Sequence, residues 1–164
     1  MATPTVIQGD VHIVGNLTGA TVTPSSSTVT DASVSASAAI SASKIVHQHV
    51  RTFGQSGNAA DETRTIHKAY GAGTVTAVVA SCITAAVGSD TCTVNIKKNG
   101  TTILSSVVTI NSSSVAYTGQ AGTVSVPSYS AGDEFTVTFD YTSAGGTAPT
   151  GVSATLIVRE NPNP

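Results

Sequence analysis

Residues 91–102 read TCTVNIKKNGTT, and this stretch indicates the class of fold. Val94 and Ile96 alternate with polar residues, which is the period of a strand that buries one face. Asn99-Gly100 follows at once, and Asn-Gly between two such runs is the strongest short-range signal for a β-hairpin. The stretch therefore predicts two antiparallel strands joined by a tight turn.

Similar runs recur on both sides of this hairpin, and turn residues separate them. In residues 134–141, Phe135, Val137 and Phe139 share one face of the expected strand. We expect strands at residues 63–70, 74–85, 91–98, 101–110, 114–118, 123–126, 134–141 and 151–160. This pattern predicts an all-β fold, an antiparallel β-sandwich of the jelly-roll type, with no α-helix. The expected core residues are Val94, Ile96, Phe135, Val137, Phe139 and Ile157.

The composition supports a β fold and argues against several classes of function. Of 164 residues, 26 are Thr, 21 are Ser and only 3 are Leu, whereas a helical bundle builds its core mainly from Leu. The 7 Lys and Arg residues are too scattered for the basic stripe that nucleic acids or anionic membranes require. No apolar run is long enough to span a membrane, and the first residues lack the pattern of a secretory signal. We therefore expect no nucleic-acid partner and no membrane partner.

Residues 1–50 differ from the rest and are expected to form an N-terminal arm ahead of the β domain at residues 51–164. From residue 20 to residue 43 nearly every residue is small, and small side chains bury too little apolar area for a core of their own. The segment is either a flexible linker or an extended β arm that packs on other chains. Aliphatic residues recur in it, which a linker would not require, so we favour the arm. The residues expected to make the arm's contacts with other chains are Val6, Ile7, Val11, Ile13, Leu17, Ile40 and Ile45.

The two cysteines, Cys82 and Cys92, both lie in strand-like segments. Two cysteines make neither a disulfide framework nor a zinc site. The simplest interpretation is two small buried thiols. A cross-strand disulfide stays open as the alternative, if the register places the two residues opposite each other.

Two histidines supply the candidate for a metal site. In His47-Gln48-His49 both imidazoles point to the same side of an extended chain. One such histidine per chain around a threefold axis would give a metal ion three nitrogen ligands. The alternative, which we favour, is a polar hinge between arm and domain. His12 and His67 stand alone and are expected to be surface or packing residues.

No set of residues indicates an enzyme. Residues 41–44 match the S-x-x-K motif of penicillin-binding enzymes, but they lie in a repetitive Ala/Ser tract and the companion motifs are absent. The acidic pairs Asp61-Glu62 and Asp133-Glu134 lie where loops meet strands, and carboxylates there commonly stabilise turns. We expect no catalytic residue and no cofactor.

Several stretches together carry a resemblance to a known family. They are residues 15–17 with the Ser/Ala tract that follows, residues 39–49, residues 94–105, and residues 131–133 before a long strand. They resemble the small capsid decoration (cement) and head-fibre proteins of tailed bacteriophages. The resemblance implies a homotrimer made in the host cytoplasm, whose arm engages the major capsid protein and whose β domain projects from the outer capsid surface of the virion. It implies stabilisation without catalysis. The alternative is a fibre or receptor-binding module, for which carbohydrate is one candidate ligand.

Overall fold

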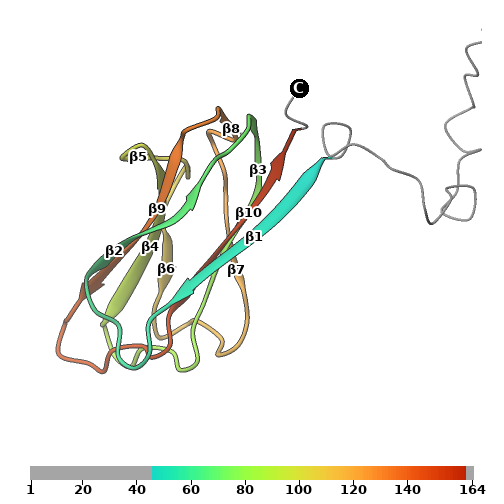
Figure 1. Ribbon diagram of the computed structural model, residues 1–164. Coiled ribbons are helices and arrows are strands. Elements are labelled where there is room, and N and C mark those ends of the chain that lie inside the picture. The colour runs from blue at the N-terminus through green and yellow to red at the C-terminus, as the bar shows by residue number, and fades with distance from the viewer. Residues whose placement is uncertain (1–45, 162–164) are drawn as a thin grey trace, which may run out of the picture. The chain divides into compact units, whose positions relative to one another are not determined.

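The structure, a computed structural model, describes residues 46–161 (Figure 1). Two five-stranded antiparallel sheets pack against each other, and the described residues contain no helix. The predicted all-β sandwich is confirmed. Residues 46–161 accordingly provide no helix that could cross a membrane. The strands are β1 (His47–Gly54), β2 (Glu62–Lys68), β3 (Gly73–Ser81), β4 (Thr91–Lys98), β5 (Thr101–Thr102), β6 (Val108–Ile110), β7 (Gln120–Gly122), β8 (Ser128–Tyr129), β9 (Glu134–Thr142) and β10 (Ser153–Glu160).

The chain crosses from one sheet to the other at every connection except those that join β4, β5 and β6 and the one that joins β7 and β8. One sheet, called the β10 sheet below, has the order β1-β10-β3-β7, and β8 also pairs with β3. The other, the β9 sheet, has the order β2-β9-β4-β5, and β6 also pairs with β4. If β5 and β6 count as one interrupted strand and β7 and β8 as another, the ten strands reduce to eight, four in each sheet. Eight strands in two such sheets are the jelly-roll arrangement.

The β4–β5 hairpin forms as its sequence predicts. Asn99 and Gly100 both have positive φ values, 49° and 83°. Positive φ at both central residues is typical of a type I′ turn, whose twist matches that of two antiparallel strands. The Asn99 side chain also bonds to a neighbouring turn: Nδ2 donates to Asp133 Oδ1 at 2.7 Å, and Oδ1 accepts the Glu134 N–H at 2.9 Å. The two turns therefore hold one end of the β9 sheet together.

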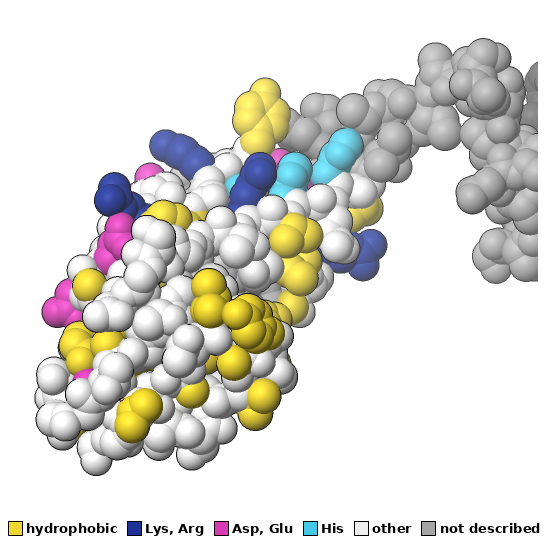
Figure 2. Space-filling view, turned by 90° about the horizontal axis from the view of Figure 1, so that it is seen from below, with side chains coloured by type: hydrophobic (Ala, Val, Ile, Leu, Met, Phe, Trp, Pro, Cys, Tyr) yellow, Lys and Arg dark blue, Asp and Glu magenta, His cyan; other side chains and the backbone are white. Residues whose placement is uncertain are grey.

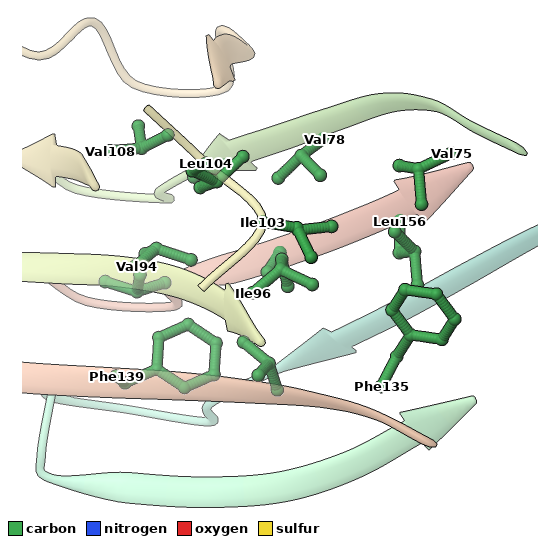
Figure 3. Packing of buried hydrophobic residues seen from close by; sticks show 14 of the residues in the cluster. Val75, Val78, Val94, Ile96, Ile103, Leu104, Val108, Phe135, Phe139 and Leu156 are labelled. Carbon is green, nitrogen blue, oxygen red and sulfur yellow. The ribbon is translucent and has the colours of Figure 1, made fainter. Parts of the chain in front are cut away.

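The core lies between the sheets and consists mainly of aliphatic side chains packed around two phenylalanines (Figure 3). Phe135 and Phe139 are 0% and 1% exposed. The predicted core residues Val94, Ile96, Phe135, Val137 and Phe139 are all confirmed as buried.

The prediction for Ile157 is wrong. Leu156 and Val158 are the buried residues of this stretch, and Ile157 lies half-buried on the other face of the β10 sheet. Residues 156–158 are an unbroken aliphatic run, so alternation of apolar and polar residues could not identify the inward positions.

Two predicted strands fail to form where the sequence is rich in Ser. Residues 114–118 form turns and irregular structure. Asn111 Oδ1 accepts the Ser113 N–H at 2.9 Å, and Ser114 Oγ accepts the Asn111 N–H at 3.0 Å. Such bonds from side chain to backbone compete with strand pairing. Residues 123–126 contribute only the single bridge between Val124 and Leu104, and the predicted strand at residues 101–110 is split into β5 and β6.

The first strand begins close to the expected end of the arm. β1 pairs with β10 along its whole length, from His47 opposite Glu160 to Gly54 opposite Ser153. Residues 47–50 are therefore part of the β10 sheet. The expected contact residues Val6, Ile7, Val11, Ile13, Leu17, Ile40 and Ile45 lie outside the described residues.

Candidate functional site

Strand β1 lies at an edge of the sandwich and exposes most of its side chains. It heads the order of the β10 sheet, with β10 as its neighbour (Figure 1). Only His49 and Phe53 are partly buried; the other residues of β1 are exposed, Val50 at 54%. An edge strand carries a row of backbone N–H and C=O groups that can pair with another strand. β1 therefore offers a partner both a pairing edge and exposed side chains.

The face of β1 that contains Phe53 changes from apolar to basic along the strand. Phe53 packs against the core residue Phe139, with ring centroids 6.0 Å apart. Arg51, His49 and His47 follow on the same face, because side chains two residues apart on a strand point the same way. Figure 2 shows histidine side chains gathered beside Lys or Arg side chains on one part of the surface.

Three imidazoles form a row at this edge, called the histidine row below: His47, His49 and His67. The ring centroids of His47 and His49 are 6.4 Å apart, and those of His49 and His67, which belongs to β2, are 5.7 Å apart. Glu160 supplies a carboxylate, with Oε2 at 3.5 Å from His49 Nε2. Glu160 is buried, and this contact places a polar group beside its carboxylate. The row joins β1 and β2, and the contact of His49 with Glu160 adds β10.

His67 is the buried member of the row. It is 7% exposed, and its Nε2 has no hydrogen-bond partner among the described residues. Burial lowers the pKa of His67 below its ordinary value; electrostatic interactions with Arg51 and His49 lower it further, and the interaction with Glu160 opposes them. The imidazole is therefore neutral at neutral pH. Of the two roles expected for His67, surface or packing, the structure shows packing.

A β-bulge explains why His67 points inward. Thr65 pairs with Thr136, but His67 pairs with Phe135, so Ile66 is an extra residue in β2. An extra residue reverses the facing of every side chain that follows it. Without the bulge His67 would lie on the outer face of the β9 sheet.

The proposed metal site at His47 and His49 is not complete within one chain. The described residues contain no group of three or more His, Cys, Asp or Glu side chains that could hold a metal ion. A site that takes one histidine from each of three copies stays a prediction.

The two acidic pairs bond to the backbone and to neighbouring side chains. Asp61 Oδ1 accepts the Tyr141 N–H at 2.7 Å, and Glu62 Oε1 lies 2.8 Å from Arg64 Nε. Asp133 accepts hydrogen bonds from the Ser130 N–H and from Asn99, and these bonds lower the pKa of its carboxyl group. Asp61 and Asp133 therefore fix the chain where loops meet β2 and β9, whereas Glu62 bonds to a side chain within β2.

Asp90 is a buried carboxylate that sequence reasoning missed. It is 1% exposed, and its oxygens accept bonds from Tyr141 Oη at 2.5 Å, the Ala144 N–H at 2.7 Å and the Gly146 N–H at 2.8 Å. These bonds, first of all that from Tyr141, hold the pKa of Asp90 below its ordinary value. Because Asp90 binds the loop after β9, its role is to fix that loop. Only its place directly before a strand could have indicated this role from sequence.

Both cysteines are free, buried thiols. Burial raises the pKa of Cys82, and burial raises the pKa of Cys92 to about 11. A thiol is nucleophilic as the thiolate. These pKa shifts therefore keep both cysteines in the unreactive form.

The aromatic residues divide into core and surface groups. Phe135, Phe139 and Tyr129 are buried. Tyr70 and Tyr117 are 81% and 80% exposed. Exposed aromatic rings are the residues that a carbohydrate-binding surface would need.

Comparisons of the sequence with known protein families and with curated proteins found no relative. No protein-family model matches the sequence, and no curated protein matches it.

Proposed function

We propose that this chain is a virion structural protein, a capsid decoration or cement protein that binds the outer capsid surface as a homotrimer and stabilises it. The observation that carries the proposal is the exposed edge strand β1. Residues 1–45 lead directly into β1, which offers its pairing edge and most of its side chains to a partner. The proposed attachment strand, β1, therefore follows the expected arm directly in the sequence.

Strand addition is the mode of attachment that this geometry favours. A segment from another chain can bond to the free backbone groups of an edge strand and so extend the sheet. Residues 1–45, fully extended, would reach up to about 150 Å, so that the arm of one copy can reach a neighbour. Three linked copies would also strengthen a weak contact with the capsid through effective concentration.

The proposed partners are the major capsid protein and two further copies of this chain. Val6, Ile7, Val11, Ile13, Leu17, Ile40 and Ile45 are the proposed contacts. The sandwich projects outward in this proposal, and hydroxyl-rich contacts such as that of Thr63 Oγ1 with Thr138 Oγ1 at 3.3 Å suit its β9 sheet to a solvated surface. The protein acts mechanically, without catalysis or cofactor, in virions assembled from protein made in the host cytoplasm.

Heat stability of particles tests the proposal. Particles made without this protein should assemble but release their DNA at a lower temperature, and added full-length protein should restore the original temperature. A protein without residues 1–45 should fail to restore it. If particles without the protein resist heat equally well but no longer adsorb to cells, the cement function is wrong.

A fibre or receptor-binding module is the second candidate function. The exposed ring of Tyr117, at one end of the sandwich, is the observation that favours it.

A further inference from the structure

A hollow of about 480 Å³ lies where the β10 sheet meets the loops at one end of the sandwich. This volume falls within the range of roughly 300–1,000 Å³ that is typical of ligand pockets. Gly54, Ser153 and Ser81 line it and are consecutive partners across β1, β10 and β3. Their neighbours Phe53 and Ala154 face the core, so these three small residues form a floor on the outer face of the sheet.

Two large side chains line the hollow beside this floor. Ile83 is 51% exposed and Tyr117 is 80% exposed, and both line it. Ile83 lies in space that is free because residue 151 is a glycine. A Cβ atom on Gly151 would lie 2.5 Å from Ile83 Cδ1. Gly151 also has a positive φ of 58°. The absence of a side chain at Gly151 thus leaves room for an apolar side chain at the edge of the hollow.

Tyr117 is held in a backbone conformation that bulky residues avoid. Its φ is 58°, in the left-handed region. The Tyr117 N–H donates to the carbonyl oxygen of Cys82 at 2.8 Å, and Cys82 itself is buried. The strained residue is therefore anchored to the core while its ring stays in solvent. The fold thus sets the place from which the Tyr117 ring projects beside the hollow.

Polar groups complete the hollow without any charge. Within residues 46–161, the nine residues that line it are all uncharged. Ser81 Oγ and Ser153 Oγ are 2.9 Å apart, so one hydroxyl donates to the other and one O–H is left for a ligand. Gln55 is fixed by bonds from Nε2 to the Ala60 oxygen at 2.7 Å and to Glu62 Oε2 at 3.1 Å. Figure 2 looks at the molecule from this end, where uncharged and apolar side chains predominate.

From this geometry we propose that the hollow at Tyr117 binds an uncharged pyranose sugar. A pyranose ring has an apolar face of C–H groups and a rim of hydroxyls. Tyr117 and Ile83 supply exposed apolar surface, and the Ser81–Ser153 pair supplies a donor and acceptors beside them. Tyr is suited to such contacts because its ring is rigid and amphipathic. The inference deepens the second candidate function, a fibre or receptor-binding module. It is independent of the capsid proposal, since it concerns only residues of the sandwich.

Titration of the full-length, ¹⁵N-labelled protein with methyl β-D-galactopyranoside, methyl β-D-glucopyranoside and methyl α-D-mannopyranoside tests this site by amide NMR shifts. For at least one sugar, the shifts should be confined to Gln55, Ser56, residues 81–83, Tyr117 and residues 151–153. Methyl β-D-glucuronide should bind more weakly than methyl β-D-glucopyranoside, because no cation lines the hollow to receive its carboxylate.

Tyr117→Ala should weaken binding by about tenfold or more, which corresponds to about 1.4 kcal/mol. Tyr70→Ala is the matched control, since Tyr70 is equally exposed but does not line the hollow, and it should bind like the wild type. Tyr117→Gly also removes the ring, but glycine adopts a positive φ without strain. Weaker binding by this variant would therefore be due to the missing ring and not to a distorted backbone. Tyr117→Phe should keep most of the affinity.

Three results would overturn the proposal. The first is the absence of localised shifts with every sugar, in which case Tyr117 is an exposed turn residue or contacts a protein. The second is an equal loss of binding in Tyr70→Ala. The third is full binding by Tyr117→Gly.

Discussion

Replacing Phe139 by Ala tests the packing of the sandwich at one residue. Phe139 is 1% exposed on β9, where it pairs with Val94 of β4, and its ring lies 6.0 Å from that of Phe53. Burial of a phenylalanine side chain contributes about 1.5–3 kcal/mol by transfer from water. The cavity left by truncation adds a further cost, which brings typical losses to about 3–5 kcal/mol.

The position of Phe139 indicates where in this range its loss should fall. β9 is paired on both sides, with β2 and with β4, which limits the movement of its backbone into the cavity. Phe53 is only partly buried on the edge strand β1 and can fill part of the space. We therefore expect a loss of about 3–4 kcal/mol, in the lower half of the range.

Urea unfolding followed by far-UV circular dichroism measures this loss, because the chain has no Trp for fluorescence. The slope of unfolding free energy against urea should match that of the wild type, which shows that the same surface becomes exposed. Tyr117→Ala is the control and should stay within about 0.5 kcal/mol of the wild type, as exposed residues do. A loss below about 1 kcal/mol for Phe139→Ala would mean that the strand faces are assigned in reverse.

Three further experiments test the turn at Asn99-Gly100, the buried histidine His67 and the two cysteine thiols. Gly100→Val should lower the unfolding free energy by about 1–2 kcal/mol, because φ is 83° there and a β-branched residue does not adopt it; an unchanged value would contradict the type I′ turn. The pKa of His67 is lowered from 6.5 in the folded chain, so the unfolded chain binds the proton more tightly and stability should fall as pH drops below about 6.5. In urea unfolding between pH 7 and pH 5, His67→Gln should show a flatter dependence, and an equally steep one would contradict a buried neutral His67. Cys82 and Cys92 should react with a thiol reagent only when the protein unfolds, since both are buried with raised pKa values; rapid reaction of the native protein would show that they are accessible.

The parts of the fold that were predictable from sequence are those where turn residues and the alternation of apolar and polar residues indicate the same structure. Asn99-Gly100 demands positive φ, so the β4–β5 hairpin was predictable, and strict alternation gave the inward face of β9. The aliphatic run at residues 156–158 has no alternation, and Ile157 was therefore assigned to the wrong face.

The candidate sites depended on features that alternation does not reveal. The bulge at Ile66 turns His67 inward, and side-chain bonds near Ser114 replace an expected strand with the turn that carries Tyr117. The floor of the hollow takes one residue from each of three strands that are distant in sequence. Only the register of the folded sheet brings them together.

The central claim, that residues 1–45 hold copies of the sandwich together, is tested most directly by native mass spectrometry of the full chain and of a chain that starts at Val46. Cutting at residue 45 keeps the whole of β1, which begins at His47. The full chain should be a trimer, and the shortened chain a folded monomer with the same unfolding free energy per sandwich. A full chain that stays monomeric at all concentrations, or a shortened chain that remains an equally tight trimer, would contradict the claim.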